Sequence, residues 1–342
     1  MPFFNKKSLT VFVSGLLIGV IITSIFAYNG VFRGDYSSEQ SGGVAYFTQD
    51  NLDYKFIKPL LNVEFINQED SLKQFPLLVK VKKQVEEEVK RNSDVEIGFY
   101  FNDLSNAGWF GVNEDEKFIP ASLLKLPMLV SYYKLRESEP DLFEKQIFYQ
   151  GEDYNPDRNT VEASTVKPGG TYTVKELMHT MIVDSDNNAL ELLYQYRKDA
   201  LKDVFEDLQA PLPESRDDIA RTDFLSPKEL AKFFLVLYHG SYLKKVDSDE
   251  ALQLLSETKY KDGLVAGIPF DVTVSHKYGE RKITLGNGNI ANEFHDCGIV
   301  YFTKSPYKIC VMTKAENLTI EKSSKIISNI SKTVYEAMSS GR

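Results

Sequence analysis

The pattern Ser-x-x-Lys places a hydroxyl and an amine one helical turn apart, and it occurs at six serines of this 342-residue chain: Ser122, Ser131, Ser164, Ser241, Ser256 and Ser305. A serine hydroxyl is a poor nucleophile until a neighbouring base removes its proton, and a lysine amine can be that base. Because the pattern is short, five of these matches must be accidental if one is catalytic. The surroundings of each match therefore have to decide between them.

Ser122 differs from the others because it opens an apolar segment, 122–133, that we expect to be a largely buried helix. The backbone N–H groups at a helix start are free to face a site, and the positive end of the helix favours developing negative charge. Lys125 lies three residues later on the same helix face and can reach the hydroxyl. The plain structural alternative is that Ser122 only caps the helix, so the pair needs support from elsewhere.

Two further motifs provide that support. Ser185-Asp186-Asn187 stands at the boundary between two predicted helices, and Lys277-Tyr278-Gly279 stands at the end of a predicted strand. Each is weak alone, because Ser-Asp-Asn is a common turn or cap and a lysine at a strand end is usually a surface residue. Together and in this order they form a specific set.

This set resembles that of the penicillin-recognising serine enzymes, and is most similar to class A β-lactamases. The stretches 295–300 and 311–314 also look like the strands that follow the third motif in that family. The likeness covers about residues 70–340. It implies that Ser122 is the nucleophile, that Lys125 is its base, and that Ser185 relays a proton to the leaving nitrogen.

The resemblance also implies a set of substrate-binding residues. Asn187 would hold the substrate amide and Lys125, and Lys277 would supply positive potential for the substrate carboxylate. The oxyanion hole would consist of the backbone N–H groups of Ser122 and of Glu280, the residue after Gly279. Tyr278 is a departure, because the family has a small threonine or serine there to bind the carboxylate.

A second departure concerns the release of the acyl group. Class A enzymes activate the hydrolytic water with a glutamate on a loop after the second motif, but 202–227 holds no Glu-x-x-Leu-Asn. Aligning 221–227 with the end of that loop places Ala210 near the glutamate position. Glu206 and Glu214 are the nearest glutamates, and we assign the role to neither.

Three functions fit these observations. The first is a β-lactamase-like hydrolase that opens β-lactam rings through an acyl-enzyme on Ser122. The second is a D-alanyl-D-alanine peptidase or penicillin-binding protein that acts on peptidoglycan stem peptides, which the missing glutamate favours. The third is a catalytically silent binding domain with the same fold, which Tyr278 favours. The four histidines show no metal-ligand spacing, and we expect neither a metal nor another cofactor.

The periodicity predicts an α+β fold, in which an antiparallel sheet is flanked by helices and joined by a helical lobe. We expect the site in a cleft between lobe and sheet. Helices are expected over 72–91, 122–133, 173–183, 187–196, 227–238, 249–257 and 320–338, and strands over 95–103, 107–112, 271–278, 296–302 and 307–313.

The N-terminal sequence predicts a membrane anchor. We divide the chain into a cytoplasmic tail (1–7), a transmembrane helix (8–28), a stalk (29–70) and a hydrolase domain (71–342). About 20 apolar residues span a bilayer core, and Lys6 and Lys7 should keep the short end in the cytoplasm. The domain would then lie outside the membrane. A cleaved signal peptide is the alternative, although its apolar stretch is usually shorter, at about 7–15 residues.

Charge and cysteine content narrow the possible partners and chemistry. A net charge of −9 and a pI near 5.2 argue against nucleic acid as the main partner. The two cysteines, Cys297 and Cys310, lie on predicted neighbouring strands. A turn at Ser305-Pro306 would place Cys310 opposite Tyr301, so two buried free thiols are favoured over a disulfide. The sequence does not predict the oligomeric state.

Overall fold

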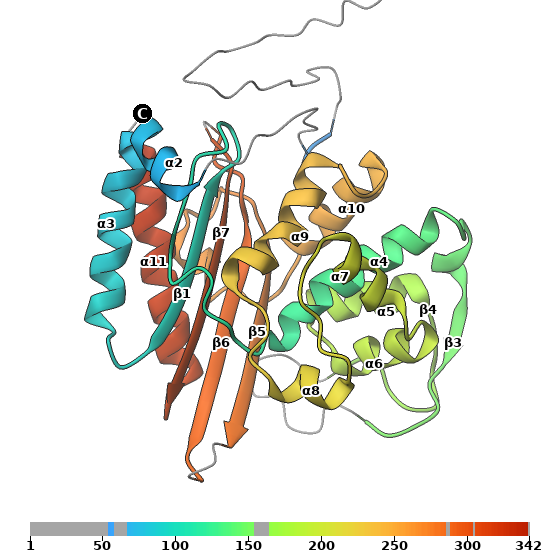
Figure 1. Cartoon of the computed structure of the whole chain (residues 1–342). Coiled ribbons are helices and arrows are strands. Elements are labelled where there is room, and N and C mark those ends of the chain that lie inside the picture. The colour runs from blue at the N-terminus through green and yellow to red at the C-terminus, as the bar shows by residue number, and fades with distance from the viewer. Residues whose placement is uncertain (1–53, 58–66, 154–163, 285–287, 304, 341–342) are drawn as a thin grey trace, which may run out of the picture.

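The computed structural model describes residues 54–57, 67–153, 164–284, 288–303 and 305–340 (Figure 1). The expected cytoplasmic tail and transmembrane helix lie outside these residues. Within them, no helix is both long and apolar enough to cross a bilayer.

The described chain is built around a five-stranded antiparallel sheet with the strand order β2-β1-β7-β6-β5. Most positions in β1, β6 and β7 are buried along the strand, as expected when helices cover both faces of a sheet. The strands are β1 Glu96–Asp103, β2 Trp109–Val112, β5 Val274–Thr284, β6 Ile290–Val300 and β7 Tyr307–Glu316.

One face of the sheet packs against two long helices, α3 (Pro76–Arg91) and α11 (Ile320–Ser340), with the short α2 (Gln68–Gln74) beside β2 (Figure 1). Their inward residues recur at helical spacing and are fully buried against the strands. Examples are Val81 and Val85 of α3 and Ile327, Ile330 and Val334 of α11.

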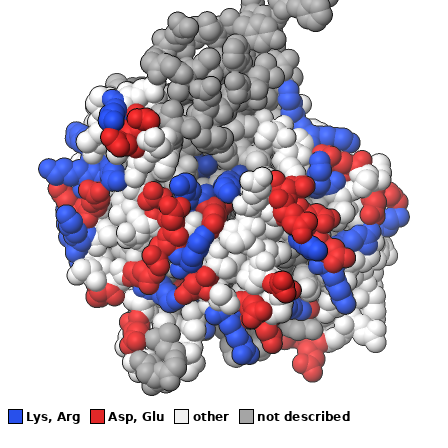
Figure 2. Space-filling model, viewed as in Figure 1, with Lys and Arg blue, Asp and Glu red and all other residues white. Residues whose placement is uncertain are grey.

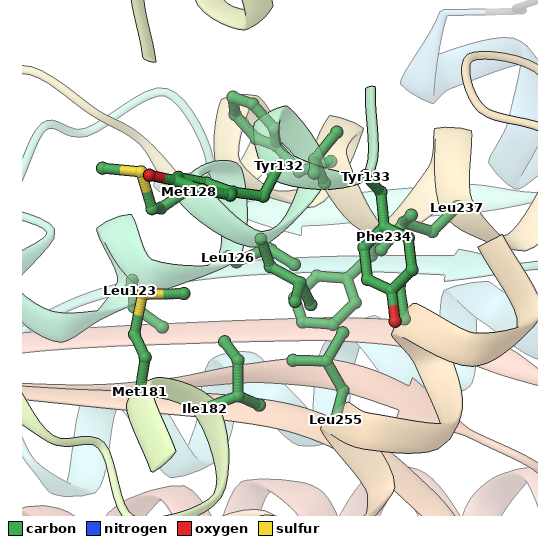
Figure 3. Close-up of a cluster of buried hydrophobic side chains, with 14 of the residues drawn as sticks. Leu123, Leu126, Met128, Tyr132, Tyr133, Met181, Ile182, Phe234, Leu237 and Leu255 are labelled. Carbon is green, nitrogen blue, oxygen red and sulfur yellow. The ribbon is translucent and has the colours of Figure 1, made fainter. Parts of the chain in front are cut away.

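The other face carries α9 (Pro227–His239) and α10 (Lys245–Ser256), and beyond them lies the helical lobe (Figure 1). Its central helix, α4, is buried over most of its length, as its apolar sequence predicts, and packs with Met181, Phe234 and Leu255 (Figure 3). The lobe comprises η1 Ala121–Leu124, α4 Lys125–Arg136, η2 Leu142–Glu144, β3 Gln146–Phe148, β4 Thr171–Thr173, α5 Val174–Val183, α6 Asn187–Tyr196, α7 Ala200–Asp207 and α8 Arg216–Arg221; η3 Val265–Gly267 precedes β5.

The α+β fold and the sheet between helices are confirmed, and every predicted helix and strand corresponds to an observed one. The prediction missed α7, α8 and the small β3–β4 sheet. The helix expected over 72–91 is two helices, α2 and α3, which are separated at Phe75, and β6 begins at Ile290 and not at 296. The prediction also ended β5 too early, because Arg281 and Lys282 continue the strand. Helix α8 has no buried residue, so its sequence carries no apolar periodicity that could reveal it.

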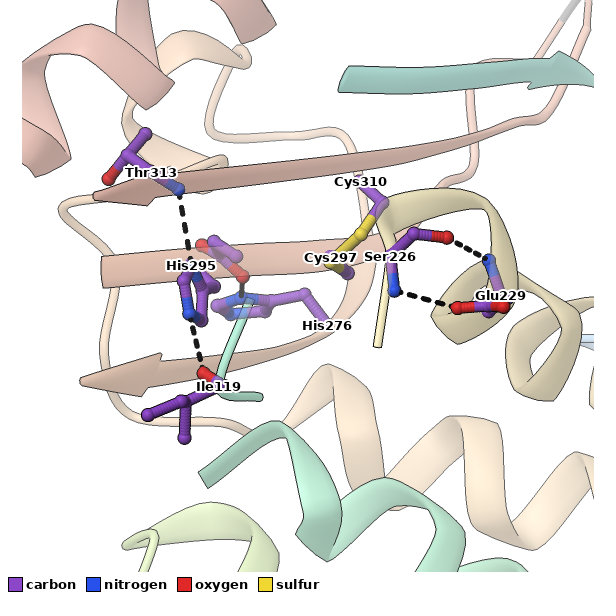
Figure 4. Close-up of a disulfide and its surroundings, with 9 residues drawn as sticks. Ile119, Ser226, Glu229, His276, His295, Cys297, Cys310 and Thr313 are labelled. Atoms are coloured by element: carbon purple, nitrogen blue, oxygen red, sulfur yellow. Dashed lines mark hydrogen bonds and ion pairs between the residues drawn. A yellow bond between two sulfur atoms is a disulfide. The ribbon is translucent and has the colours of Figure 1, made fainter. Parts of the chain in front are cut away.

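The expectation of two free thiols was wrong, because Cys297 and Cys310 form a disulfide between β6 and β7 (Figure 4). Val300 pairs with Tyr307, so a longer connection replaces the tight turn expected at Ser305-Pro306. Asp103 accepts a hydrogen bond from Ser305 Oγ at 2.6 Å, which ties this connection to β1. The resulting register places the two cysteines directly opposite each other.

The described part of the segment predicted as a stalk packs on the domain. Phe56 and Ile57 are buried, and the Phe56 N–H donates to the Asp249 carboxylate at 2.7 Å. The Phe56 ring also meets Tyr301 edge to face. The domain therefore includes residues that precede α2 in the sequence.

Acidic and basic side chains are interspersed over the face of the molecule shown in Figure 2. The net negative charge of the sequence is therefore not gathered into one acidic field on this face.

Candidate active site

Ser122 lies at the wall of a cleft of about 510 Å³ between strand β5 and the helical lobe. It belongs to η1, so the α-helix starts at Lys125 and not at Ser122 as expected. The preceding residue, Ala121, has φ 51°, which is a left-handed conformation that few residues other than glycine adopt. The serine is therefore presented by a tight, strained turn and not by a regular helix start.

Lys125 is fully buried and its amine is surrounded by oxygen atoms. Its Nζ lies 3.1 Å from Ser122 Oγ, 3.2 Å from Ser185 Oγ and 2.8 Å from Asn187 Oδ1, and it also donates to the Ser185 carbonyl oxygen. The first two motifs of the sequence thus meet at one amine. Such contact distances permit direct proton transfer between the lysine and either serine.

Ser185 occupies a second left-handed backbone position, with φ 56°. Asp186, the next residue, accepts the N–H of Ala189 at 3.0 Å and caps α6, which fixes the start of that helix. Lys277 Nζ donates to Ser185 Oγ at 2.8 Å. The Ser185 hydroxyl therefore lies between two lysine amines, and the third motif joins the other two.

Gly279 brings the backbone of β5 against the nucleophile turn. A Cβ at this position would lie 2.9 Å from the Pro120 oxygen and 3.0 Å from the Ser122 nitrogen, closer than side chains tolerate. Only glycine permits this approach. It places Glu280, the next residue, in the wall of the cleft that holds Ser122.

Tyr278 is a predicted substrate-binding residue that does not line the cleft, and neither Lys277 nor Gly279 lines it either. Its side chain is 1 % exposed and stacks on Tyr260, with ring centroids 4.4 Å apart. Tyr278 packs with the apolar cluster on the α11 side, and the Lys277 ammonium, which donates to Ser185, also lies 4.2 Å from the centre of the Tyr278 ring. The tyrosine therefore does not occupy the place of the family's small hydroxyl.

The opposite wall of the cleft, under α8, is largely apolar. It is formed by residues of α4, α6, α7 and α8: Met128, Leu190, Tyr194, Leu201, Ile219 and Ala220. Ala210, Glu206 and Glu214 do not line the cleft, so none of them takes the place of the family's loop glutamate among the described lining residues.

One carboxylate does stand in this wall. Glu191 of α6 receives two hydrogen bonds from the Arg216 guanidinium of α8 and one from Gln195 at 2.9 Å. Burial opposes ionisation of Glu191, but the bonds from Arg216 and Gln195 prevail and lower its pKa. Sequence reasoning missed this pair. The sequence signal that could have revealed it is a glutamate one helical turn after Asn187, placed among apolar residues of the same helix.

The β5–β6 wall is charged, with Glu280, Arg281, Lys282 and Glu293 beside Asn292. Burial lowers the pKa of Arg281 from its ordinary value. In the described part of the chain, no three His, Cys, Asp or Glu side chains are grouped so that they could hold a metal ion.

A family model described as "Beta-lactamase enzyme family" matches residues 80–338. Solved structures with a similar fold include PBP-A, at 24 % identity and a TM-score of 0.65, covering 77 % of this chain and 97 % of that one. A PBP-A mutant was solved as an acyl-enzyme complex with penicillin G, at 23 % identity and a TM-score of 0.66, with the same coverage.

A class A β-lactamase from Mycobacterium abscessus has 20 % identity and a TM-score of 0.66, covering 76 % of this chain and 99 % of that one. At these identities the likeness is one of fold. No curated protein matches the sequence.

Proposed function

Because the chain belongs to the β-lactamase enzyme family, we propose that it opens β-lactam rings by forming an acyl-enzyme on Ser122. The observation that carries this proposal is the contact of 3.1 Å between Lys125 Nζ and Ser122 Oγ inside a buried polar network. A buried amine within hydrogen-bond reach of a serine hydroxyl can act as the general base that activates it.

Acylation then follows from the contacts. Lys125, in its neutral form, takes the proton of Ser122 as Oγ bonds to the lactam carbonyl carbon. The backbone N–H groups of Ser122 and Glu280 stabilise the oxyanion. Ser185 gives its proton to the lactam nitrogen as the C–N bond breaks, and the proton on Lys125 restores Ser185 across 3.2 Å. Lys277 holds the Ser185 hydroxyl and attracts the substrate carboxylate.

The second half of the reaction needs a water molecule activated on the acyl carbonyl. The apolar lining under α8 and the engagement of Glu191 by Arg216 favour a slow step here. They support a second candidate, a penicillin-binding protein or D-alanyl-D-alanine peptidase whose acyl-enzyme persists. Its physiological acyl donor would be a peptidoglycan stem peptide.

The proposal includes an outward-facing domain held by a helix at 8–28. Its support is the length and apolar character of that segment, together with the Cys297–Cys310 disulfide. Disulfides persist in oxidising compartments and are rare in the cytosol. Both β-lactams and wall peptides would reach the site there.

A single labelling experiment tests these candidates. The full-length protein in detergent is incubated with a fluorescent penicillin, and both bound label and free ring-opened product are followed over time. Continuous product indicates a hydrolase, whereas a stable label that Ser122→Ala abolishes indicates the penicillin-binding protein. Absence of both label and product at saturating penicillin would refute both enzymatic functions and leave a silent binding domain.

A further inference from the structure

The chain that leads into Ser122 is held by two buried side chains of β6. His295 Nε2 lies 2.9 Å from the carbonyl oxygen of Ile119, and a Glu293 carboxylate oxygen accepts the N–H of the same residue at 3.1 Å. Both side chains have no exposed surface. The two polar backbone groups of Ile119 are therefore fixed from one strand.

The surroundings of His295 determine which ring nitrogen carries the proton. The backbone N–H of Thr313 donates to Nδ1 at 3.2 Å, so Nδ1 must be unprotonated (Figure 4). Nε2 then carries the proton and donates it to the Ile119 oxygen. The imidazole thus links β7 to the nucleophile turn, and the Phe118 ring meets it edge to face at 5.6 Å.

Glu293 extends the connection to the end of the α8 loop. Its second oxygen lies 3.4 Å from Lys314 Nζ, and Lys314 also pairs with Asp223. Two residues later, the Leu225 carbonyl accepts the N–H of Phe118 at 3.1 Å. The two residues just before the nucleophile turn are therefore both connected to β6 and β7. Ile119 is held directly by His295 and Glu293, and Phe118 is held by Leu225, which lies two residues after the Asp223 that pairs with Lys314.

The turn needs such support because of Ala121. A non-glycine residue in the left-handed region persists only where its surroundings hold it. On one side, Gly279 packs closely against Pro120 and Ser122. On the other side, the turn is preceded by Ile119, whose backbone N–H and carbonyl oxygen are both held by side chains, those of Glu293 and His295.

We propose that His295 and Glu293 are positioning residues for acylation, which hold Ile119 so that Ser122 Oγ stays within reach of Lys125. This inference rests on the proposed role of Ser122 as nucleophile. Although Glu293 also lines the cleft, both side chains act in this role through the backbone of Ile119 and not on the reacting atoms. Loss of either contact lets the turn relax, lengthens the Ser122–Lys125 distance and slows the chemical step without weakening the initial binding of the β-lactam.

The test uses full-length His295→Leu, Glu293→Met and Glu293→Gln. Leucine and methionine remove the contacts with Ile119, whereas glutamine keeps an oxygen that can accept the Ile119 N–H. Val334→Ala, in the buried face of α11, is the control for lost stability alone. Misplacement of a reacting group by about 1 Å costs about a hundredfold in rate. We therefore expect the maximal acylation rate to fall about tenfold to a hundredfold for His295→Leu and Glu293→Met.

The concentration of fluorescent penicillin that gives half-maximal acylation should stay unchanged in these variants, and Glu293→Gln should retain most of the rate. A merely structural role predicts instead that Val334→Ala, matched in melting temperature, slows acylation equally. That result, or an unchanged acylation rate in His295→Leu, would overturn the proposal.

Hydrogen exchange provides a measurement that does not depend on activity. Peptides that cover 117–124 should exchange faster in His295→Leu and Glu293→Met than in the wild type or Val334→Ala. If no variant or wild-type protein is acylated, the proposed function fails but this comparison still decides whether β6 holds the turn. Unchanged exchange across 117–124 would refute the positioning role by itself.

Discussion

The two walls of the cleft around Ser122 differ in chemistry. One side of the cleft, here called the first wall, carries Ser122 and is backed by the fully buried Lys125, Ser185 and Lys277, which do not line the cleft themselves. With Ser122 they form a continuous set of contacts of 2.8–3.2 Å between amines and hydroxyls. On the other wall, under α8, apolar side chains dominate, and the carboxylate of Glu191 is held by Arg216. One wall is organised to move protons and the other is not.

The difference separates the two halves of a serine acyl transfer. Formation of the acyl-enzyme needs a base, a proton relay and an oxyanion hole, and in the proposed mechanism the groups of the first wall take these roles. Its breakdown needs a carboxylate or equivalent base beside a water molecule. Among the described residues, the second wall offers the carboxylate of Glu191, whose pKa is lowered by its partners, which makes it a weaker base.

The largest expected effect is on the first wall. Lys125→Met removes the base but keeps a side chain of similar length, so we expect acylation by a fluorescent penicillin to fall by about 10²–10⁴-fold. The melting temperature should also fall somewhat, because the Ser185 carbonyl oxygen and Asn187 Oδ1 lose their buried donor, so the labelling rate is measured at a temperature where the variant is folded. Lys134→Met, on the same helix and partly exposed, is the control. An unchanged labelling rate in Lys125→Met would remove the lysine from the mechanism.

The second wall can be altered by adding a carboxylate. Ala220 lines the cleft from α8, and we expect Ala220→Glu to shorten the lifetime of the acyl-enzyme at least about tenfold. Acylation should change little, because the first wall is untouched. The decay of bound label after removal of free penicillin measures this. If Ala220→Gln, which adds no base, shortens the lifetime equally, access of water and not basicity limits the step.

The smallest effect concerns the ion pair that holds Glu191. Arg216→Gln should lower the free energy of unfolding at pH 7 by about 1 kcal/mol, a modest value because the arginine side chain is 59 % exposed and water screens it. Arg197→Gln, which breaks an outlying pair with Glu139, is the matched control.

The pH dependence of this effect follows from the lowered pKa of Glu191. Its stabilising contribution is present above the ordinary pKa of 4.5 and is lost as the pH falls through the lower folded-state value. The difference between wild type and Arg216→Gln should therefore shrink when urea unfolding is repeated well below pH 4.5. If the difference in free energy of unfolding stays constant down to that pH, the Arg216–Glu191 ion pair is not its source.

Much of the fold and the first wall could be predicted because the signals are local. Helical and strand periodicity identified most elements, and three short motifs identified Ser122, Lys125, Ser185, Asn187 and Lys277 before their side chains were seen together. The burial of Tyr278 was not predicted, because it depends on Tyr260, whose ring stacks on it from another segment of the chain.

The features that were missed depend on contacts between distant segments. The pairing of Glu191 with Arg216 joins two helices, one of which has no apolar periodicity. The register of β6 and β7 depends on Asp103 of β1, which holds Ser305 in the connection. Likewise, nothing near Ile119 in the sequence indicates that His295 and Glu293 contact it.

The Cys297–Cys310 disulfide has a consequence for strand registration. A shift of β6 by one residue would send every side chain to the opposite face of the sheet, and His295 would then exchange its place with an apolar neighbour such as Phe294. The covalent bond between opposed residues of β6 and β7 excludes that slip once it has formed. Oxidation of one cysteine pair thereby selects, among the possible alignments of two neighbouring strands, the alignment in which His295 faces Ile119.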